Sequence, residues 1–94
     1  MNYPIIIKQL FINEDVIIDD IKLEQRTRDL YTAKETVIDY SCIATFYRSH
    51  CPFDATVLHL TDGECLFVEM PYRDFKDMVF TMHDEISNKN LLNN

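Results

Sequence analysis

Six side chains in this 94-residue sequence are of the types that bind zinc or act as nucleophile and base. Thiolate and imidazole are the ligands that zinc prefers, but structural zinc sites usually bring them in close pairs such as C-x-x-C or H-x-x-x-H. No such pair occurs here, so the sequence predicts no metal and no other cofactor. The six residues are Cys42, His50, Cys51, His59, Cys65 and His83.

His59 is the candidate for acid–base chemistry, because it lies in the middle of an expected strand, where an imidazole needs a polar partner or water. It could act with the thiol of Cys65 or with the carboxylate of Asp62. In the strand pairing given below, Cys65 falls on the opposite face from His59, which separates the two. We therefore expect structural histidines at His59 and His83, no catalytic residues and no enzymatic activity.

Four carboxylates gather in a short segment and could bind a cation or imitate a row of phosphates: Glu14, Asp15, Asp19 and Asp20. Calcium loops need a glycine at their sharp turn and a distal bidentate carboxylate, and neither follows at the required spacing. Gly63 is the only glycine in the sequence, so a glycine-rich phosphate-binding loop and nucleotide hydrolysis are excluded. The four carboxylates are interpreted chiefly as a charged edge that faces water and prevents strand-to-strand aggregation.

The charge balance limits the partners that the protein can bind. With 9 basic and 16 acidic residues the net charge is −7, so the average field repels nucleic-acid backbones and anionic lipids. We expect no direct binding of nucleic acid. No window approaches the roughly 18 apolar residues of a membrane span, and the N-terminal apolar run lacks the features of a signal peptide. The sequence therefore predicts a cytoplasmic protein with reduced cysteines and no membrane contact.

Only a few structural elements are available to position these residues. The composition, 47% apolar and 27% charged with one glycine, is typical of one ordered domain, which we expect to span residues 1–94. Runs of β-branched and aromatic residues predict a strand over 5–12 and one long strand or two short ones over 37–48. The charged segment 20–31 fits neither the helical period of 3.6 residues nor the strand period of 2 residues. Two structures stay open for it: a strand that continues into a loop, or a helix.

The strongest local signal is the hairpin in "LHLTDGECLFVEM", residues 58–70. An Asp-Gly pair between apolar runs predicts a type I′ turn, with Asp62 and Gly63 as its two loop residues and Thr61 facing Glu64. Both faces of the hairpin are then mostly apolar, so both need cover. The expected faces are Thr56, Leu58, Leu60, Cys65, Phe67 and Glu69 on one side and Ala55, Val57, His59, Leu66, Val68 and Met70 on the other.

The segment that follows, residues 71–87, is predicted to be an amphipathic helix. Pro71 suits its first turn, and apolar side chains recur at intervals of three and four, with Met78 and Phe80 on either flank of the stripe. After Ser87 the pattern ends, so residues 88–94 are expected to form a loose tail. The stripe consists of Tyr72, Phe75, Val79, Met82 and Ile86.

Together the elements predict an α+β domain. It consists of a small, mainly antiparallel sheet of four or five strands, with one C-terminal amphipathic helix packed on one face. Residues 38–86 resemble FlbD-type small motility proteins and, more loosely, LytTR-type modules, in which a T-x-I-x-L-x-x-G hairpin returns through V-x-E. The LytTR resemblance implies DNA binding, against which the acidic balance argues. The matching residues are Thr56, Leu58, Leu60, Gly63, Val68 and Glu69.

Because one helix is available for two apolar faces, we expect a second copy or another protein to cover the remaining face. The leading hypothesis is a non-enzymatic protein-interaction domain that acts as a homodimer or higher oligomer. The residues expected at its interface are Met78, Phe80, Val57 and Val68.

Two other classes of function stay open. The first is a small acidic inhibitor of a nucleic-acid-binding or defence protein, of the kind that phages encode, which would use the four carboxylates named above. The second is a small-ligand binder with a pocket between protomers. Its contacts would come from Tyr40, Tyr47, Arg48 and His50.

Overall fold

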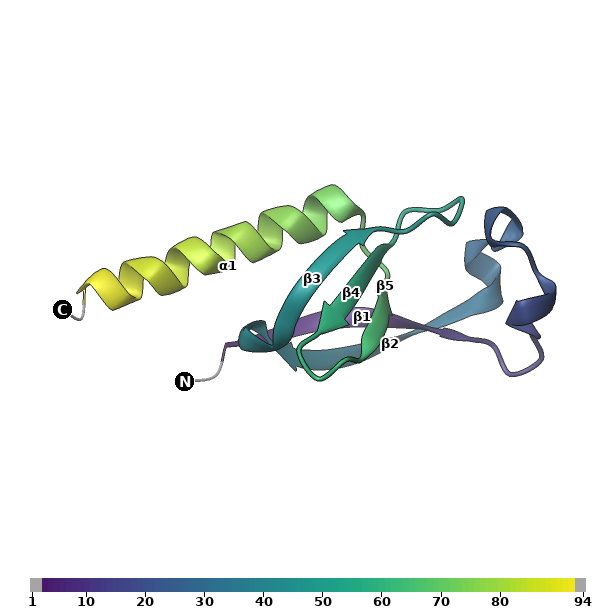
Figure 1. Ribbon diagram of the computed structural model, residues 1–94, viewed down its shortest axis with the longest axis horizontal. Coiled ribbons are helices and arrows are strands. Elements are labelled where there is room, and N and C mark those ends of the chain that lie inside the picture. Colours follow the sequence, from purple (N-terminus) through teal and green to yellow (C-terminus); the bar gives the residue numbers. More distant parts are fainter. Residues whose placement is uncertain (1–2, 93–94) are drawn as a thin grey trace.

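The computed structural model describes residues 3–92, without the side chains of residues 90–92. Within that part lie five strands, four single-turn 3-10 helices and one α-helix, so the predicted α+β class is confirmed (Figure 1). The elements are β1 (Pro4–Ile12), η1 (Ile18–Asp20), η2 (Leu23–Gln25), η3 (Arg28–Leu30), β2 (Tyr31–Asp39), η4 (Tyr40–Cys42), β3 (Ile43–Arg48), β4 (Thr56–Leu60), β5 (Cys65–Val68) and α1 (Tyr72–Leu92).

The sheet is strongly curled. Its strand order is β2-β1-β5-β4-β3, and all neighbouring strands are antiparallel. The two edge strands, β2 and β3, are joined only by η4, whose three residues span roughly 10 Å. A flat sheet would hold its edge strands roughly 19 Å apart, at about 4.8 Å for each neighbouring pair. The sheet must therefore bend enough to bring the Asp39 end of β2 close to the Ile43 end of β3.

The sheet consists of two units with a narrow seam between them. The ribbon, β1 and β2, is paired along nine residues of each strand, and the meander, β3 to β5, is paired from neighbour to neighbour. Between the units the strand register contains one pair, Gln9 and Val68. The backbone N–H of Glu69 also donates to the carbonyl of Lys8 at 2.8 Å. In Figure 1 the ribbon accordingly crosses beneath the meander and does not continue it as a flat layer.

The main core lies between α1 and the concave face of the sheet. The predicted helical stripe is confirmed, since Phe75 is fully buried and its ring lies 4.9 Å from that of Phe46 in an edge-on arrangement. The helix continues to Leu92, so residues 88–92 of the expected tail are helical, and residues 93–94 lie outside the described part. The segment after Ser87 contains no glycine or proline to end the helix. The buried side chains are Ile5, Ile7, Ile38, Leu58, Leu66, Val68, Phe75 and Val79.

A second, smaller core lies on the opposite, outer face of the sheet. The rings of Tyr31, Phe53 and Phe67 form a triangle with centroid separations of 5.3 to 5.7 Å. Leu10 and Ala55 are buried beside them. The two long connections, residues 13–30 and 49–55, supply much of this cover. The outer face of the sheet is therefore covered in part by connections of the same chain. This corrects the expectation that only a second molecule could cover it.

The β4–β5 hairpin has a register one residue away from the predicted one. The N–H of Leu60 donates to the carbonyl of Glu64 at 2.9 Å, so the loop contains three residues, not two. Gly63 alone has a positive φ among the described residues, +92°, whereas a type I′ turn requires two. The carboxylate of Asp62 accepts the N–H of Glu64 at 2.9 Å, a local turn interaction typical of Asp.

This shift exchanges the partners across the hairpin. Leu58 faces Leu66 and Thr56 faces Val68 on the buried side. His59 faces Cys65 on the outer side.

Of the two structures left open for residues 20–31, the helix is absent and so is the strand of the other alternative, but the loop that this alternative included is present as the β1–β2 connection. It consists of the three turns η1 to η3, and β2 begins at Tyr31. Arg26 holds these turns together, because its guanidinium donates to the carbonyls of Ile21 at 3.0 Å and Ile18 at 3.2 Å. The strand signal over 37–48 corresponds to the end of β2 and the whole of β3, with η4 between them.

Candidate functional site

A hollow of about 340 Å³ lies on the outer face of the sheet, and we call it the outer hollow. Its walls come from three parts of the chain: the connection before β2, the β3–β4 connection, and the outward side chains of the meander. Tyr31, Val57 and Phe67 are among the apolar residues that line it. The residues with polar groups that line it include Arg26, Tyr47, Ser49, His50 and Cys51.

Beside the outer hollow, three side chains from neighbouring strands meet in a row. The Tyr47 hydroxyl lies 3.1 Å from Nε2 of His59, and Sγ of Cys65 lies 4.0 Å from the same nitrogen. The prediction that Cys65 and His59 lie on opposite faces is therefore wrong, because it followed from the shifted register. The imidazole nitrogen is much closer to the phenol than to the thiol, so its hydrogen bond is made mainly with Tyr47.

Tyr31 and Arg26 meet at the wall of the outer hollow that the β1–β2 connection supplies. Burial raises the pKa of the Tyr31 hydroxyl, and the nearby Cys51 thiol acts in the same direction. The positive charge of Arg26 opposes both effects on the pKa. The guanidinium is held in this position by its two bonds to backbone carbonyls of the connection.

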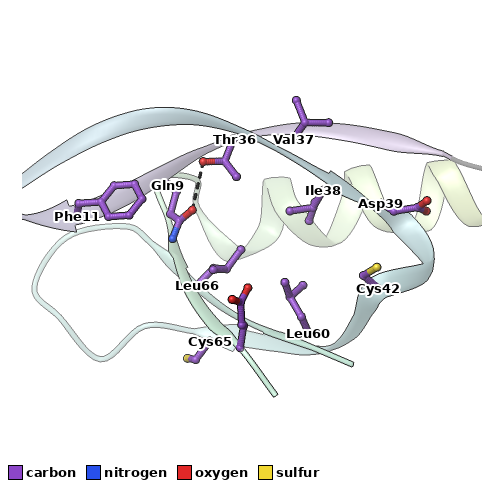
Figure 2. A pocket seen from close by; sticks show the side chains of 11 residues that line it. Gln9, Phe11, Thr36, Val37, Ile38, Asp39, Cys42, Leu60, Cys65 and Leu66 are labelled. Atoms are coloured by element: carbon purple, nitrogen blue, oxygen red, sulfur yellow. Dashed lines mark hydrogen bonds between the residues drawn. The ribbon is translucent and has the colours of Figure 1, made fainter. Parts of the chain in front are cut away.

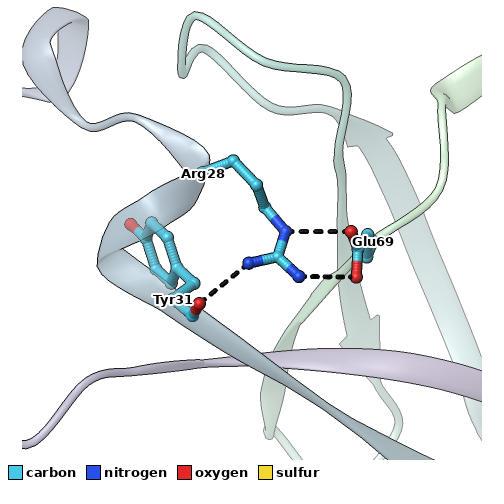
Figure 3. A network of polar contacts seen from close by, with 3 residues as sticks. All are labelled: Arg28, Tyr31 and Glu69. Atoms are coloured by element: carbon cyan, nitrogen blue, oxygen red, sulfur yellow. Dashed lines mark hydrogen bonds and ion pairs between the residues drawn. The ribbon is translucent and has the colours of Figure 1, made fainter.

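Arg28 fastens the same connection to the end of β5 (Figure 3). Its Nε lies 2.9 Å from Oε1 of Glu69, and its Nη2 lies 3.0 Å from Oε2, which is a two-point contact. Its Nη1 donates to the carbonyl of Tyr31 at 2.8 Å. The hydrogen bonds from Arg28 lower the pKa of the Glu69 carboxyl, and those to Glu69 raise the pKa of Arg28. The connection that carries Arg26 is thus positioned by a specific polar contact.

A larger, open groove of about 650 Å³ lies between the ribbon and the turn of the β4–β5 hairpin (Figure 2). It exists because β1 and β5 share one register pair and then separate. The hydroxyl of Thr36 donates to Oε1 of Gln9 at 3.2 Å at one side of the groove. Much of its lining is apolar, with Phe11, Val37, Ile38, Leu60 and Leu66 beside the carboxylates of Asp39 and Glu64.

The outer face of the ribbon carries an exposed apolar pair, Ile6 and Val37, next to a charged pair, Lys8 and Glu35. We call these four residues the ribbon surface. Ile6 and Val37 face each other across the two strands and are 62% and 61% exposed. The next outward pair along the ribbon is Lys8 and Glu35. Beyond Ile6 a shallow groove against α1 includes Met78. An apolar centre with opposite charges beside it is thus open to contact.

The four residues expected at an interface do not form one surface. Val68 is fully buried in the main core, a consequence of the hairpin register, and so has no surface to offer a partner. Val57 is half-buried and lines the outer hollow. Met78 is half-buried on the flank of α1 that faces β1, and Phe80 is exposed on the opposite flank.

The residues expected to contact a ligand are also divided. Tyr47 and His50 both line the outer hollow. Arg48 lines a different hollow beside Pro52 and Arg73. The Tyr40 hydroxyl lies 2.9 Å from Nδ1 of His83, which ties η4 to α1.

The four carboxylates considered for cation binding are all exposed, two in the turn after β1 and two in η1: Glu14, Asp15, Asp19 and Asp20. Among the described residues no group of three or more His, Cys, Asp or Glu side chains is arranged to hold a metal ion. No helix in the described range has the length and apolar character needed to cross a bilayer.

Sequence inspection missed the arginines that organise the outer face. Arg26 and Arg28 belong to the segment that fitted neither helical nor strand periodicity, and their partners are backbone carbonyls and a distant carboxylate. The available signal was two arginines, which together with Lys22 are the basic residues of a connection that carries six carboxylates. Exposure of Ile6 and Val37 had no sequence signal, since both occur in ordinary strand patterns.

Comparison with known proteins finds no family model that matches the chain, no curated protein with significant sequence similarity and no solved structure with significant similarity of fold. The resemblance of residues 38–86 to FlbD-type proteins stays a prediction from the hairpin motif.

Proposed function

We propose that the protein is a non-enzymatic protein-interaction domain that acts as a homodimer through the ribbon surface. The observation that carries this proposal is the exposure of Ile6 and Val37. They lie directly opposite each other and are 62% and 61% exposed, although both are large and apolar. A second copy that covered them would remove this apolar surface from water.

The charges beside this pair favour a second copy as the occupant. If two ribbon surfaces pack about a two-fold axis parallel to the strands, Ile6 of each copy lies over Val37 of the other. The same operation places Lys8 of each copy opposite Glu35 of the other, because these residues form the next outward pair. Opposite charges then meet twice at an isologous contact, even though each chain has a net charge of −7.

The proposal is tested by measuring mass in solution with sedimentation or light scattering. We expect the native chain to have twice the monomer mass and Ile6→Lys to be monomeric. Ile17→Lys is the matched control, because Ile17 is 69% exposed but lies in the connection, away from the ribbon surface. A native chain that is monomeric at high protein concentration, or an Ile6→Lys variant that still dimerises, would contradict the proposal.

A charge exchange tests the geometry of the contact. Lys8→Glu should weaken the dimer, because it places like charges opposite each other. The double variant Lys8→Glu with Glu35→Lys should restore association, since it reverses the pair and keeps it complementary. If the double variant is no better than the single one, the proposed two-fold arrangement is wrong.

A further inference from the structure

The outer hollow differs in charge from the rest of the chain. The sequence has 16 acidic residues, yet no Asp or Glu is among the described residues that line this hollow. Arg26 and His50 line it instead. In a protein that repels anions on average, this is a local position at which an anion would meet a positive charge and no carboxylate.

The body of the hollow suits a flat apolar group. The rings of Tyr31, Tyr47 and Phe67 contribute to its walls, together with the aliphatic side chain of Val57. Aromatic rings prefer offset or edge-on contacts with other rings, for which these walls provide surface. The volume of about 340 Å³ is at the lower end of the range typical of small-molecule sites.

The guanidinium of Arg26, which lines the hollow, is already held in place by hydrogen bonds. Its Nε and Nη2 donate to the carbonyls of Ile21 and Ile18, so its orientation does not depend on a ligand. The guanidinium also interacts with the Tyr31 hydroxyl at the wall of the hollow, so a carboxylate bound there would meet both Arg26 and Tyr31. A charged donor that is positioned in advance loses little conformational entropy when it binds a carboxylate.

We propose that the outer hollow binds a small aromatic carboxylate, with the ring between the aromatic walls and the carboxylate at Arg26. This site is independent of the proposed dimer, because the residues of the ribbon surface do not line the outer hollow. It also lies within one chain, in contrast to the predicted pocket between protomers. Of the expected ligand contacts it retains Tyr47 and His50.

The test uses 2-naphthoate as the probe and 2-naphthalenemethanol, which has the same ring system without the charge, as the comparison. Two-dimensional amide NMR spectra of the full chain are recorded as each compound is added up to millimolar concentration. We expect 2-naphthoate to shift amide signals around residues 26, 31, 47–51 and 65–67, and to bind about tenfold more tightly than the alcohol. Equal affinity for the two compounds, shifts confined to other surfaces, or no binding would overturn the proposal.

Variants identify the groups responsible. Arg26→Gln should weaken 2-naphthoate binding about tenfold, and the matched control Arg48→Gln should leave it within about twofold, because Arg48 lines a different hollow. Arg26→Gln also removes hydrogen bonds within the connection, so Val57→Trp, which fills the hollow from β4, is the second variant. It should abolish binding of both compounds while the amide spectrum outside the hollow is retained. Unchanged binding in both Arg26→Gln and Val57→Trp would exclude this site.

Discussion

The two cores of this protein are built in different ways. The main core is formed by regular elements, β1, β2, β4, β5 and α1, and several of its side chains are fully buried. The outer core is formed largely by connections, and its aromatic residues Phe53 and Phe67 stay half-buried. In the main core, the periodic burial of apolar side chains from strands and helix is sufficient to explain the packing. The second side also depends on polar contacts at Arg26 and Arg28, and these leave a hollow that regular packing would have filled.

The largest effect is expected from truncating the main core at Phe75. Phe75→Ala removes a fully buried ring and its contact with Phe46, so it should lower the free energy of unfolding by about 3–5 kcal/mol. Phe80→Ala is the control, because this ring is 55% exposed and the change should stay within about 0.5 kcal/mol. Chemical denaturation measures both. Similar losses for the two variants would mean that α1 does not bury the face assigned to it.

A smaller and more local effect is expected in the outer core. Phe53→Ala removes one ring of the aromatic triangle from a half-buried position, so we expect a loss of about 1–2 kcal/mol. Hydrogen exchange should show faster opening of residues 13–30, with the amides of α1 and β4 unchanged. Equal acceleration in all elements would show that the two cores are one cooperative unit, and the contrast between them would fail.

The same difference explains how far sequence analysis reached. The helix was predicted from residues such as Phe75 and Val79, because a stripe with a period near 3.6 is a direct record of one buried face. The segment around Arg26 was not assigned, because its structure depends on bonds to backbone carbonyls that leave no period in the sequence. The β1 strand was recognised, but the exposure of Ile6 depends on which neighbours the fold supplies.

The hairpin register failed for a narrower reason. Asp-Gly is compatible with a two-residue loop and with a three-residue loop that has glycine at its last position. The hydrogen bond from the N–H of Glu64 to Asp62 accompanies the second loop. Because the turn was assigned one residue too short, His59 and Cys65 were predicted on opposite faces, although they face each other across the hairpin.

Gly63 allows that turn to be tested. Gly63→Val should cost about 1 kcal/mol or more, because φ is +92° and a β-branched residue is strained there. No atom lies within 4 Å of the position that a Cβ would take, so the cost comes from the backbone and not from a clash. Gly63→Asn should cost less, since Asn tolerates positive φ better. Chemical denaturation of the two variants gives the comparison, and equal costs would place the turn elsewhere.

The smallest effect concerns pH and the contact between Arg28 and Glu69. Because the pKa of Glu69 is lowered in the folded state, its contribution to stability is present above the unfolded carboxyl pKa of about 4.3 and is lost as pH falls through the lower folded value. Glu69→Gln should therefore lower the melting temperature slightly near neutral pH and leave it unchanged in strong acid. Glu24→Gln, an exposed change in the β1–β2 connection that carries Arg28, is the control. A difference that persists in acid would show that the Glu69 carboxylate is not its source.

The single register pair between β1 and β5 also has a consequence for folding kinetics. Gln9 and Val68 are 59 residues apart in the sequence, so closing this contact carries a larger loop entropy than forming the β3–β4–β5 meander. We therefore expect the local β3–β4–β5 hairpins to form first and the contact between ribbon and meander to form late. Until then both β1 and β5 present unpaired edges, which can accept the same strand from another chain. Refolding at high concentration is therefore the condition in which ribbons would be exchanged between molecules.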